Sequence, residues 1–293
     1  MTAFVPRPAR IVDAHVHLWD PANTAWYPYL SGGQELGLGD TTGMNRRFGA
    51  ATYRAESVGW NVEKLVNVAA ATGVHSVSET IDLDRRGEVD GQPAAIIGGI
   101  PPTGSVAEAV ELLDRQAAAS RFRGVRPMGR FDGPLPPVEV LRELAGRELL
   151  FELLARPDQL AVAAEGLAAV DDLVVVVEHT GWPRADTAEE RALWHDGLAA
   201  LADLGERVHC KLSGIAMAAG SMEPGALASW LEPAIERFGV ERCCFASNFP
   251  VDGLHGTLDE LWSAYSAVTA GLAPAERDAL FATNAERLYS IAG

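Results

Sequence analysis

The stretch LVVVVEH at positions 173–179 places five consecutive apolar residues before two ionisable ones. Side chains of a strand alternate between the two faces of its sheet, so a strand that is apolar at every position is buried on both faces. Parallel sheets covered by helices have strands of this kind. The stretch therefore predicts a buried parallel strand that ends with polar side chains.

Similar apolar runs recur along the chain, and from residue 90 onward each is followed by a polar turn and then by an amphipathic segment with helical spacing. The predicted strands are 10–17, 64–70, 94–100, 122–128, 148–155, 173–179, 208–214 and 243–248. The predicted helices are 105–119, 137–146, 157–169, 188–203 and 224–238. Eight strand–helix units predict a single α/β domain over residues 1–293, a (β/α)8 TIM barrel. An open, doubly wound sheet is the alternative, but no G-x-G-x-x-G fingerprint follows the first strand.

Composition limits the classes of function. The formal net charge is −16 and the pI is about 4.8, which argues against binding to nucleic acid or to an anionic membrane. Three cysteines are too few for a disulfide framework, the first ten residues lack a signal-peptide core, and no apolar run could span a membrane. We expect a cytoplasmic protein that acts on a small molecule, with homo-oligomerisation left open.

Residues 18–63 form an unusually long first strand-to-helix connection, rich in tryptophan, tyrosine and glycine. Connections of this length in compact domains are usually functional. In a barrel this segment would cover the C-terminal mouth, where active sites form. The alternative is an inserted subdomain that only packs against the barrel.

Histidines stand at the ends of two predicted strands. His15 and His17 have the two-residue spacing that places both on one face, and His179 ends the 173–179 run. A single histidine on an apolar strand is more often a core residue than a ligand, but a pair joined by a third is harder to explain in that way. We expect the three imidazoles to share one site. Asp13, on the same strand face, is expected to orient one of the rings.

Other strand ends and mouth loops supply candidate substrate contacts. Arg126 and Arg130 together suit a carboxylate, which a guanidinium binds through two hydrogen bonds. Trp19 and Trp182 offer flat aromatic faces for a ring-shaped substrate, although each could equally stiffen its loop.

The ordered motifs resemble those of the amidohydrolase superfamily, in particular its amidohydrolase-2 branch of sugar-lactone and 2-pyrone-4,6-dicarboxylate lactonases. The resemblance rests on DAHVHLWDP, WYPYL, GVR, EHTGWP, CKLSGI and FASNFPVD, which span nearly the whole chain in the family's order. It implies that His15, His17 and His179 either ligate a divalent metal, with zinc as the expected ion, or hydrogen-bond a substrate carbonyl. It also implies that Arg126 binds a substrate carboxylate or hydroxyl, and that Lys211 lies near the substrate.

The chain departs from the family pattern at Asn248, where the family usually has an aspartate that acts as general base. An amide does not titrate near pH 7, so Asn248 can orient a water but cannot accept its proton. Asp252 in the mouth loop is the preferred substitute base, and Glu152 is a further candidate. Glu178 has the opposite parity to His179 and is expected to face away. Alternatively, a metal makes a strong base unnecessary.

We therefore expect a hydrolase that opens a cyclic ester by attack of an activated water, with Asn248 and Asp252 added to the three histidines as catalytic residues. One alternative is a non-oxidative decarboxylase of the same superfamily. Another is a ligand-binding barrel that lost catalysis together with its aspartate.

Overall fold

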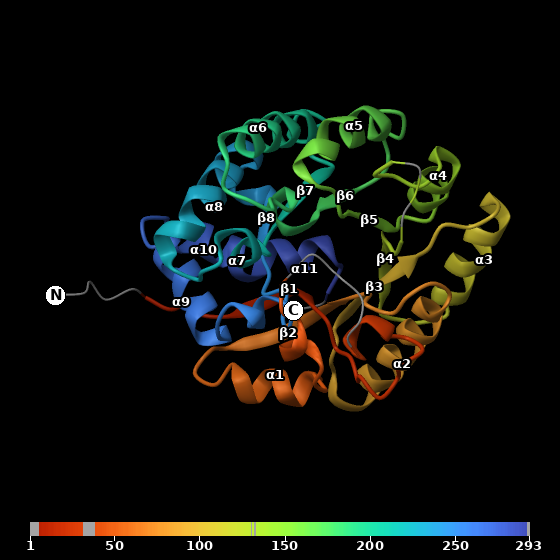
Figure 1. The fold of residues 1–293 in the computed structure, drawn as a ribbon, viewed down its shortest axis with the longest axis horizontal. Helices are drawn as coiled ribbons and strands as arrows, with labels where there is room; N and C mark the ends of the chain where they lie inside the picture. Colours follow the sequence, from red (N-terminus) through yellow and green to blue (C-terminus); the bar gives the residue numbers. More distant parts are fainter. Residues whose placement is uncertain (1–5, 32–38, 130, 132, 292–293) are drawn as a thin grey trace.

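The computed structural model describes residues 6–31, 39–129, 131 and 133–291, and eight parallel strands form its central sheet (Figure 1). Each strand pairs with its neighbour in the sequence, so the spatial order is β1 to β8. The strands are β1 (Ile11–Val16), β2 (Val62–Val68), β3 (Ala95–Ile100), β4 (Phe122–Pro127), β5 (Leu150–Leu153), β6 (Val175–Val177), β7 (Val208–Leu212) and β8 (Cys243–Phe245). All eight fall within or beside the predicted runs, and the predicted barrel fold is confirmed.

The barrel closes between β1 and the segment that follows β8. The backbone N–H of Asn248 donates to the carbonyl of His15 at 2.8 Å, and that of His17 donates to Phe249 at 2.9 Å. The buried Asp13 carboxylate adds a side-chain link, since it accepts from the Ser247 N–H at 2.8 Å and from the Tyr53 hydroxyl at 2.7 Å. Asp13 thus holds two chain segments together and has no bond to an imidazole ring among the described contacts, contrary to the sequence-based expectation.

Helices surround the strands (Figure 1). They are α2 (His75–Asp90), α3 (Val106–Gln116), α4 (Val138–Gly146), α5 (Pro157–Leu167), α6 (Ala188–Ala202), α8 (Pro224–Phe238) and α9 (Leu258–Val268), with the shorter α1 (Ala50–Glu56), α7 (Ile215–Ala219), α10 (Pro274–Asp278) and α11 (Asn284–Leu288). The sequence did not predict α2, because its buried face includes the polar residues Glu79, Thr80 and Asp84. Glu79 accepts from two backbone N–H groups and from the Tyr27 hydroxyl, which ties the long first connection to the barrel.

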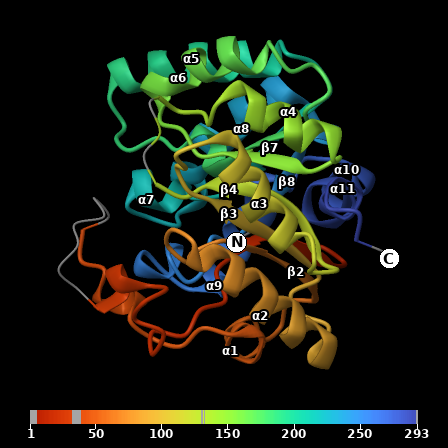
Figure 2. The ribbon, with the colours of Figure 1, turned by 90° about the vertical axis from the view of Figure 1, so that its right-hand side faces the viewer.

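The two ends of the barrel differ. The first connection and α7 lie on one side in Figure 2, whereas α10 and α11 lie on the opposite side. Tyr289, just after α11, packs with the apolar residues that fill the barrel interior, including Val12, Val66 and Ile97. The C-terminal helices therefore close the N-terminal end of the barrel, and the loops of the other end are free to build a site.

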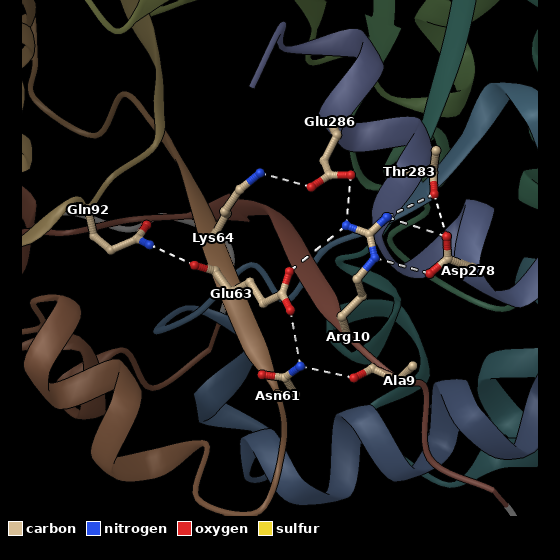
Figure 3. A network of polar contacts seen from close by, with 9 residues as sticks. All are labelled: Ala9, Arg10, Asn61, Glu63, Lys64, Gln92, Asp278, Thr283 and Glu286. Atoms are coloured by element: carbon tan, nitrogen blue, oxygen red, sulfur yellow. Dashed lines mark hydrogen bonds and ion pairs between the residues drawn. The ribbon is translucent and has the colours of Figure 1, made fainter. Parts of the chain in front are cut away.

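A network of ion pairs fastens these C-terminal helices to the first two strands (Figure 3). Arg10, just before β1, donates to Glu286 at 2.8 Å and to Asp278 at 3.2 Å. Lys64 of β2 reaches the other oxygen of Glu286 at 2.9 Å. The network joins residues that are more than 200 positions apart in the sequence.

Replacing Arg10 with glutamine is expected to lower the free energy of unfolding by about 1–2 kcal/mol, because the charge-assisted hydrogen bonds to Asp278 and Glu286 are lost from a partly buried site. Denaturant unfolding would measure this change. Arg54→Gln is the control, since its pair with Asp90 is longer and exposed and is expected to contribute less than about 0.5 kcal/mol. Equal losses in the two variants would contradict the stabilising role of the network.

Candidate active site

A cavity of about 210 Å³ lies at the C-terminal ends of the strands. Its lining is His17, Trp19, Tyr29, Met44, Ala69, Ala70, Arg126, Met128, Leu154, His179, Trp182, Met217, Asn248 and Val251. The first connection contributes three of these residues, Trp19, Tyr29 and Met44, in agreement with its predicted position over the mouth. A larger cavity of about 610 Å³ is lined, among the described residues, by prolines and other uncharged residues from Pro102 to Gly166, so the described part of its lining offers no acid–base group.

Alternation along β1 brings two imidazoles into contact. His15 is fully buried, and its Nε2 lies 3.2 Å from Nε2 of His17. The Nδ1 of His17 lies 2.8 Å from the Val68 carbonyl oxygen, which accepts only, so Nδ1 carries the proton and Nε2 has a free lone pair. Two facing lone pairs would repel one another. Either a proton on His15 or a cation must therefore lie between the two rings.

His179 joins this pair from the opposite side of the barrel. Its ring centroid lies 4.6 Å from that of His15, and its Nδ1 lies 3.0 Å from the Ser213 hydroxyl. Strand β6 ends at Val177, and His179 and Thr180 then adopt left-handed backbone conformations, with φ of 51° and 55°. The structure thus brings together the three histidines that the sequence predicts to share a site.

Glu178 also belongs to this cluster, and the expectation that it faces away was wrong. Its side chain is fully buried, with Oε2 3.3 Å from Nη2 of Arg126 and 3.7 Å from Nε2 of His179. Strict alternation applies only to extended backbone, and the left-handed turn at His179 breaks it. The sequence prediction extended this strand to residue 179, whereas β6 ends at Val177 in the structure.

The electrostatics of the cluster follow from burial. Burial lowers the pKa of His17 to about 3, with Arg126 acting in the same direction, and it holds the pKa values of His15 and His179 well below the usual range. Burial raises the pKa of Glu178 to about 7, although Arg126 opposes this. All three imidazoles are therefore neutral at pH 7, and their nitrogens are available to a cation or as hydrogen-bonding groups.

Lys211 lies deeper than its predicted role requires. Its fully buried Nζ donates to Glu152 at 2.6 Å and lies 3.4 Å from Nδ1 of His15. The Tyr289 hydroxyl donates to the other Glu152 oxygen at 2.8 Å. Because the Lys211 side chain runs through the barrel interior, it is not among the described residues that line the cavity, which differs from the expected substrate contact. Glu152, a further candidate base, accepts from Lys211 and Tyr289 in the barrel interior and likewise is not among the described residues that line the cavity.

Asn248 lines the cavity, but Asp252 lies behind it. Asp252 is fully buried, and its Oδ1 accepts from Nδ2 of Asn248 at 2.8 Å. Burial raises the pKa of Asp252 to about 7, while the bond from Asn248 opposes the rise. The Asp252 carboxylate does not line the cavity, so Asn248 separates it from a water held there. The structure therefore places Asp252 behind Asn248, and the role of Asp252 as a base stays a prediction.

Three of the four side chains predicted to contact substrate from strand ends and mouth loops lie at the cavity. Arg126, Trp19 and Trp182 line the cavity. Trp19 stacks on His17 with parallel rings 5.7 Å apart, so it also fixes that imidazole. Arg130 lies outside the described residues.

The donor atoms fit a divalent metal. Single donor atoms of His15, Glu178 and His179 all lie within 4.8 Å of one another. The Glu178 oxygens have no hydrogen-bond partner in the described part of the chain, as expected of a carboxylate beside a cation. Two ligands at normal zinc distances can be at most about 4.2 Å apart, so small side-chain rotations would close the cluster on an ion. The Lys211 ammonium beside His15 weakens attraction for a dication without blocking access.

Comparison with known proteins identifies the family of this chain. The Amidohydrolase family model matches residues 12–291. The chain belongs to this amidohydrolase family. Family membership makes it an enzyme of a hydrolase-type superfamily, as predicted.

Two curated relatives match its sequence. An uncharacterized protein, y4mH, of Sinorhizobium fredii is 32% identical over 96% of this chain and 98% of its own length. An L-fucono-1,5-lactonase of Burkholderia multivorans is 32% identical over 50% of this chain and 53% of its own length.

Solved structures share the fold. A zinc-bound amidohydrolase from Burkholderia multivorans has a TM-score of 0.79 at 23% identity, covering 97% of this chain and 100% of that chain. A 2,6-dihydroxybenzoate decarboxylase from Rhizobium has a TM-score of 0.64 at 15% identity, covering 98% and 100%. No helix among the described residues has the length and hydrophobicity needed to cross a membrane.

Proposed function

We propose that this amidohydrolase opens a cyclic ester, either a sugar lactone or a lactone that carries a carboxylate. The observation that carries the proposal is the convergence of three neutral imidazoles with Arg126 and Glu178 beside a cavity of about 210 Å³. The partial match to a lactonase supports the same substrate class.

Arg126 is the residue that binds the substrate's carboxylate or hydroxyl group. It lines the cavity, and its Nε has no hydrogen-bond partner among the described residues. Its Nη2 is paired with Glu178, which keeps the guanidinium in place. Trp182 forms a flat wall of the same cavity and suits the face of a ring.

Glu178 is the proton acceptor in this proposal. The oxygen of an attacking water bonds to the lactone carbonyl carbon, and the water proton passes to Glu178. The ester C–O bond then breaks, and the departing ring oxygen takes that proton back from Glu178, which gives the hydroxy acid and restores the carboxylate. Burial raises the pKa of Glu178 to about 7 even though its carboxylate is paired with Arg126, so it is well suited to accept a proton. No covalent bond between enzyme and substrate is required.

We further propose that His15, His17 and His179 hold a zinc ion, with the Glu178 carboxylate beside them. When bound, the ion supplies positive charge that polarises the substrate carbonyl. Zinc accepts imidazole nitrogen and carboxylate oxygen; His15, His179 and Glu178 bring such donors within 4.8 Å of one another, and Nε2 of His17 lies 3.2 Å from Nε2 of His15.

A panel of six-membered sugar lactones, carboxylated pyrones and carboxylated aromatic compounds tests the function, with mass analysis of the products and metal analysis of the purified protein. We expect products that gain one water, about one zinc per chain, and loss of hydrolysis on chelation that zinc reverses. Loss of carbon dioxide from the aromatic substrates would show a decarboxylase instead. Turnover of none of the compounds would favour a ligand-binding barrel.

A further inference from the structure

The position of Asp252 suggests a role that does not require it to reach the substrate. We propose that Asp252 is a positioning residue that fixes the side-chain amide of Asn248, so that the carbonyl oxygen of this amide is the atom presented to the cavity. The inference rests on the proposed function for its catalytic consequence, but its structural part can be tested separately.

The amide orientation follows from the chemistry of the two partners. An ionised carboxylate can only accept, and the bond from Asn248 favours the ionised form of Asp252, so the Asn248 atom 2.8 Å from Oδ1 is the NH₂ group. The sulfur of Met217 lies 4.0 Å from the same nitrogen and takes its other side. Because an amide is planar, the oxygen then points away from both partners. Asn248 lines the cavity together with His17, whereas Asp252 does not, so the oxygen is the atom of this amide that is presented to the cavity.

The backbone holds the pair rigidly. Asn248 adopts a left-handed conformation with φ of 56°, and its N–H is bonded to β1 through His15. The N–H of Asp252 donates to the carbonyl of Asn248 at 3.1 Å, so both side chains project from one tight turn. Full burial of the carboxylate excludes water as a competing partner. The turn therefore supports a single amide orientation.

This arrangement preserves a hydrogen-bond acceptor at the position where an aspartate is expected. An oxygen at residue 248 can accept a hydrogen bond from the attacking water and hold it in place, although it cannot take its proton. With the amide reversed, an NH₂ group would face the cavity and would compete with the water for the same acceptors. The orientation of Asn248 is therefore expected to affect kcat more than KM.

An exchange of the two residues tests the proposal. In Asp252→Asn the new amide can donate as well as accept, so Asn248 is free to reverse, and we expect kcat to fall tenfold or more with KM within threefold of the parent. In the double variant Asn248→Asp/Asp252→Asn, the amide at position 252 donates to a carboxylate whose other oxygen faces the cavity. This exchange is expected to restore kcat to within threefold of the parent.

Asp84→Asn is the matched control. Asp84 accepts from Ser120 and Arg121 away from the cavity, so the same change of carboxylate to amide is expected to leave kcat unchanged. An unaltered kcat in Asp252→Asn, or an exchanged variant no more active than Asp252→Asn, would overturn the proposal. A fall in kcat that only follows the folded fraction would also overturn it.

A second measurement does not depend on catalysis. The side-chain NH₂ signals of Asn248, identified by their absence in Asn248→Asp, are expected to exchange slowly with solvent in the parent and at least tenfold faster in Asp252→Asn. Fast exchange in the parent would refute the positioning role. Slow exchange in a parent that hydrolyses no lactone would support the positioning role of Asp252 and would refute the proposed function.

Discussion

Glu178→Gln is expected to lower kcat for lactone hydrolysis by about 10²–10⁴-fold, which is the usual contribution of a positioned general base. Glutamine has nearly the same shape but cannot accept the water's proton. The variant also loses the charge of the ion pair with Arg126, but the amide oxygen can still accept from the guanidinium, so the cluster of His15, Glu178 and His179 should keep its packing. Steady-state kinetics of the purified variant would measure the change.

Glu286→Gln is a useful control because the same chemical change occurs at the opposite end of the barrel. It weakens the bonds to Arg10 and Lys64, so stability should fall while kcat stays near that of the parent. If Glu178→Gln kept kcat within threefold of the parent while remaining folded, Glu178 would not be the proton acceptor.

Lys211→Met is expected to destabilise the fold by about 3–5 kcal/mol, because it leaves the Glu152 charge buried without its cation. Both side chains are fully buried, so water cannot replace the lost partner. Denaturant unfolding followed by fluorescence or circular dichroism would measure the loss. The double variant Lys211→Met/Glu152→Leu removes both charges and should recover at least half of it.

Lys64→Met provides the comparison for this second prediction. Lys64 pairs with Glu286 at 2.9 Å, but its side chain is 16% exposed and water can solvate the remaining carboxylate. Its expected cost is about 1 kcal/mol. Similar losses in Lys64→Met and Lys211→Met, or a double variant as unstable as Lys211→Met, would show that the buried pair has no special energetic role.

Most of the barrel could be predicted because each strand can be recognised from its own run of residues. Runs such as residues 173–179 are apolar at every position, and only burial on both faces accounts for that pattern. Among the longer helices the exceptions were α9 and α2, and the buried face of α2 carries Glu79 and Asp84. These carboxylates find their partners in distant residues, such as Tyr27 and Arg121, that no local pattern identifies.

The candidate site was predicted in part. His15, His17 and Arg126 stand on or just after extended strands, where alternation gives the direction of a side chain. Alternation failed for Glu178, because the backbone beside it leaves the extended region. It was also insufficient for Lys211, since a long side chain can run deep into the barrel even when its Cα lies near the mouth.

The amino-acid sequence by itself determined the barrel fold, the family and the shared site of His15, His17 and His179. These features could be predicted because periodicity and strand-end position are properties of neighbouring residues. Only the tertiary structure decided that Glu178 enters the cluster, that Lys211 pairs with Glu152, and that Asp252 lies behind Asn248. Those outcomes depend on left-handed turns and on which distant charges satisfy one another in a buried interior. They are set by the packing of the whole chain and not by any single stretch of it.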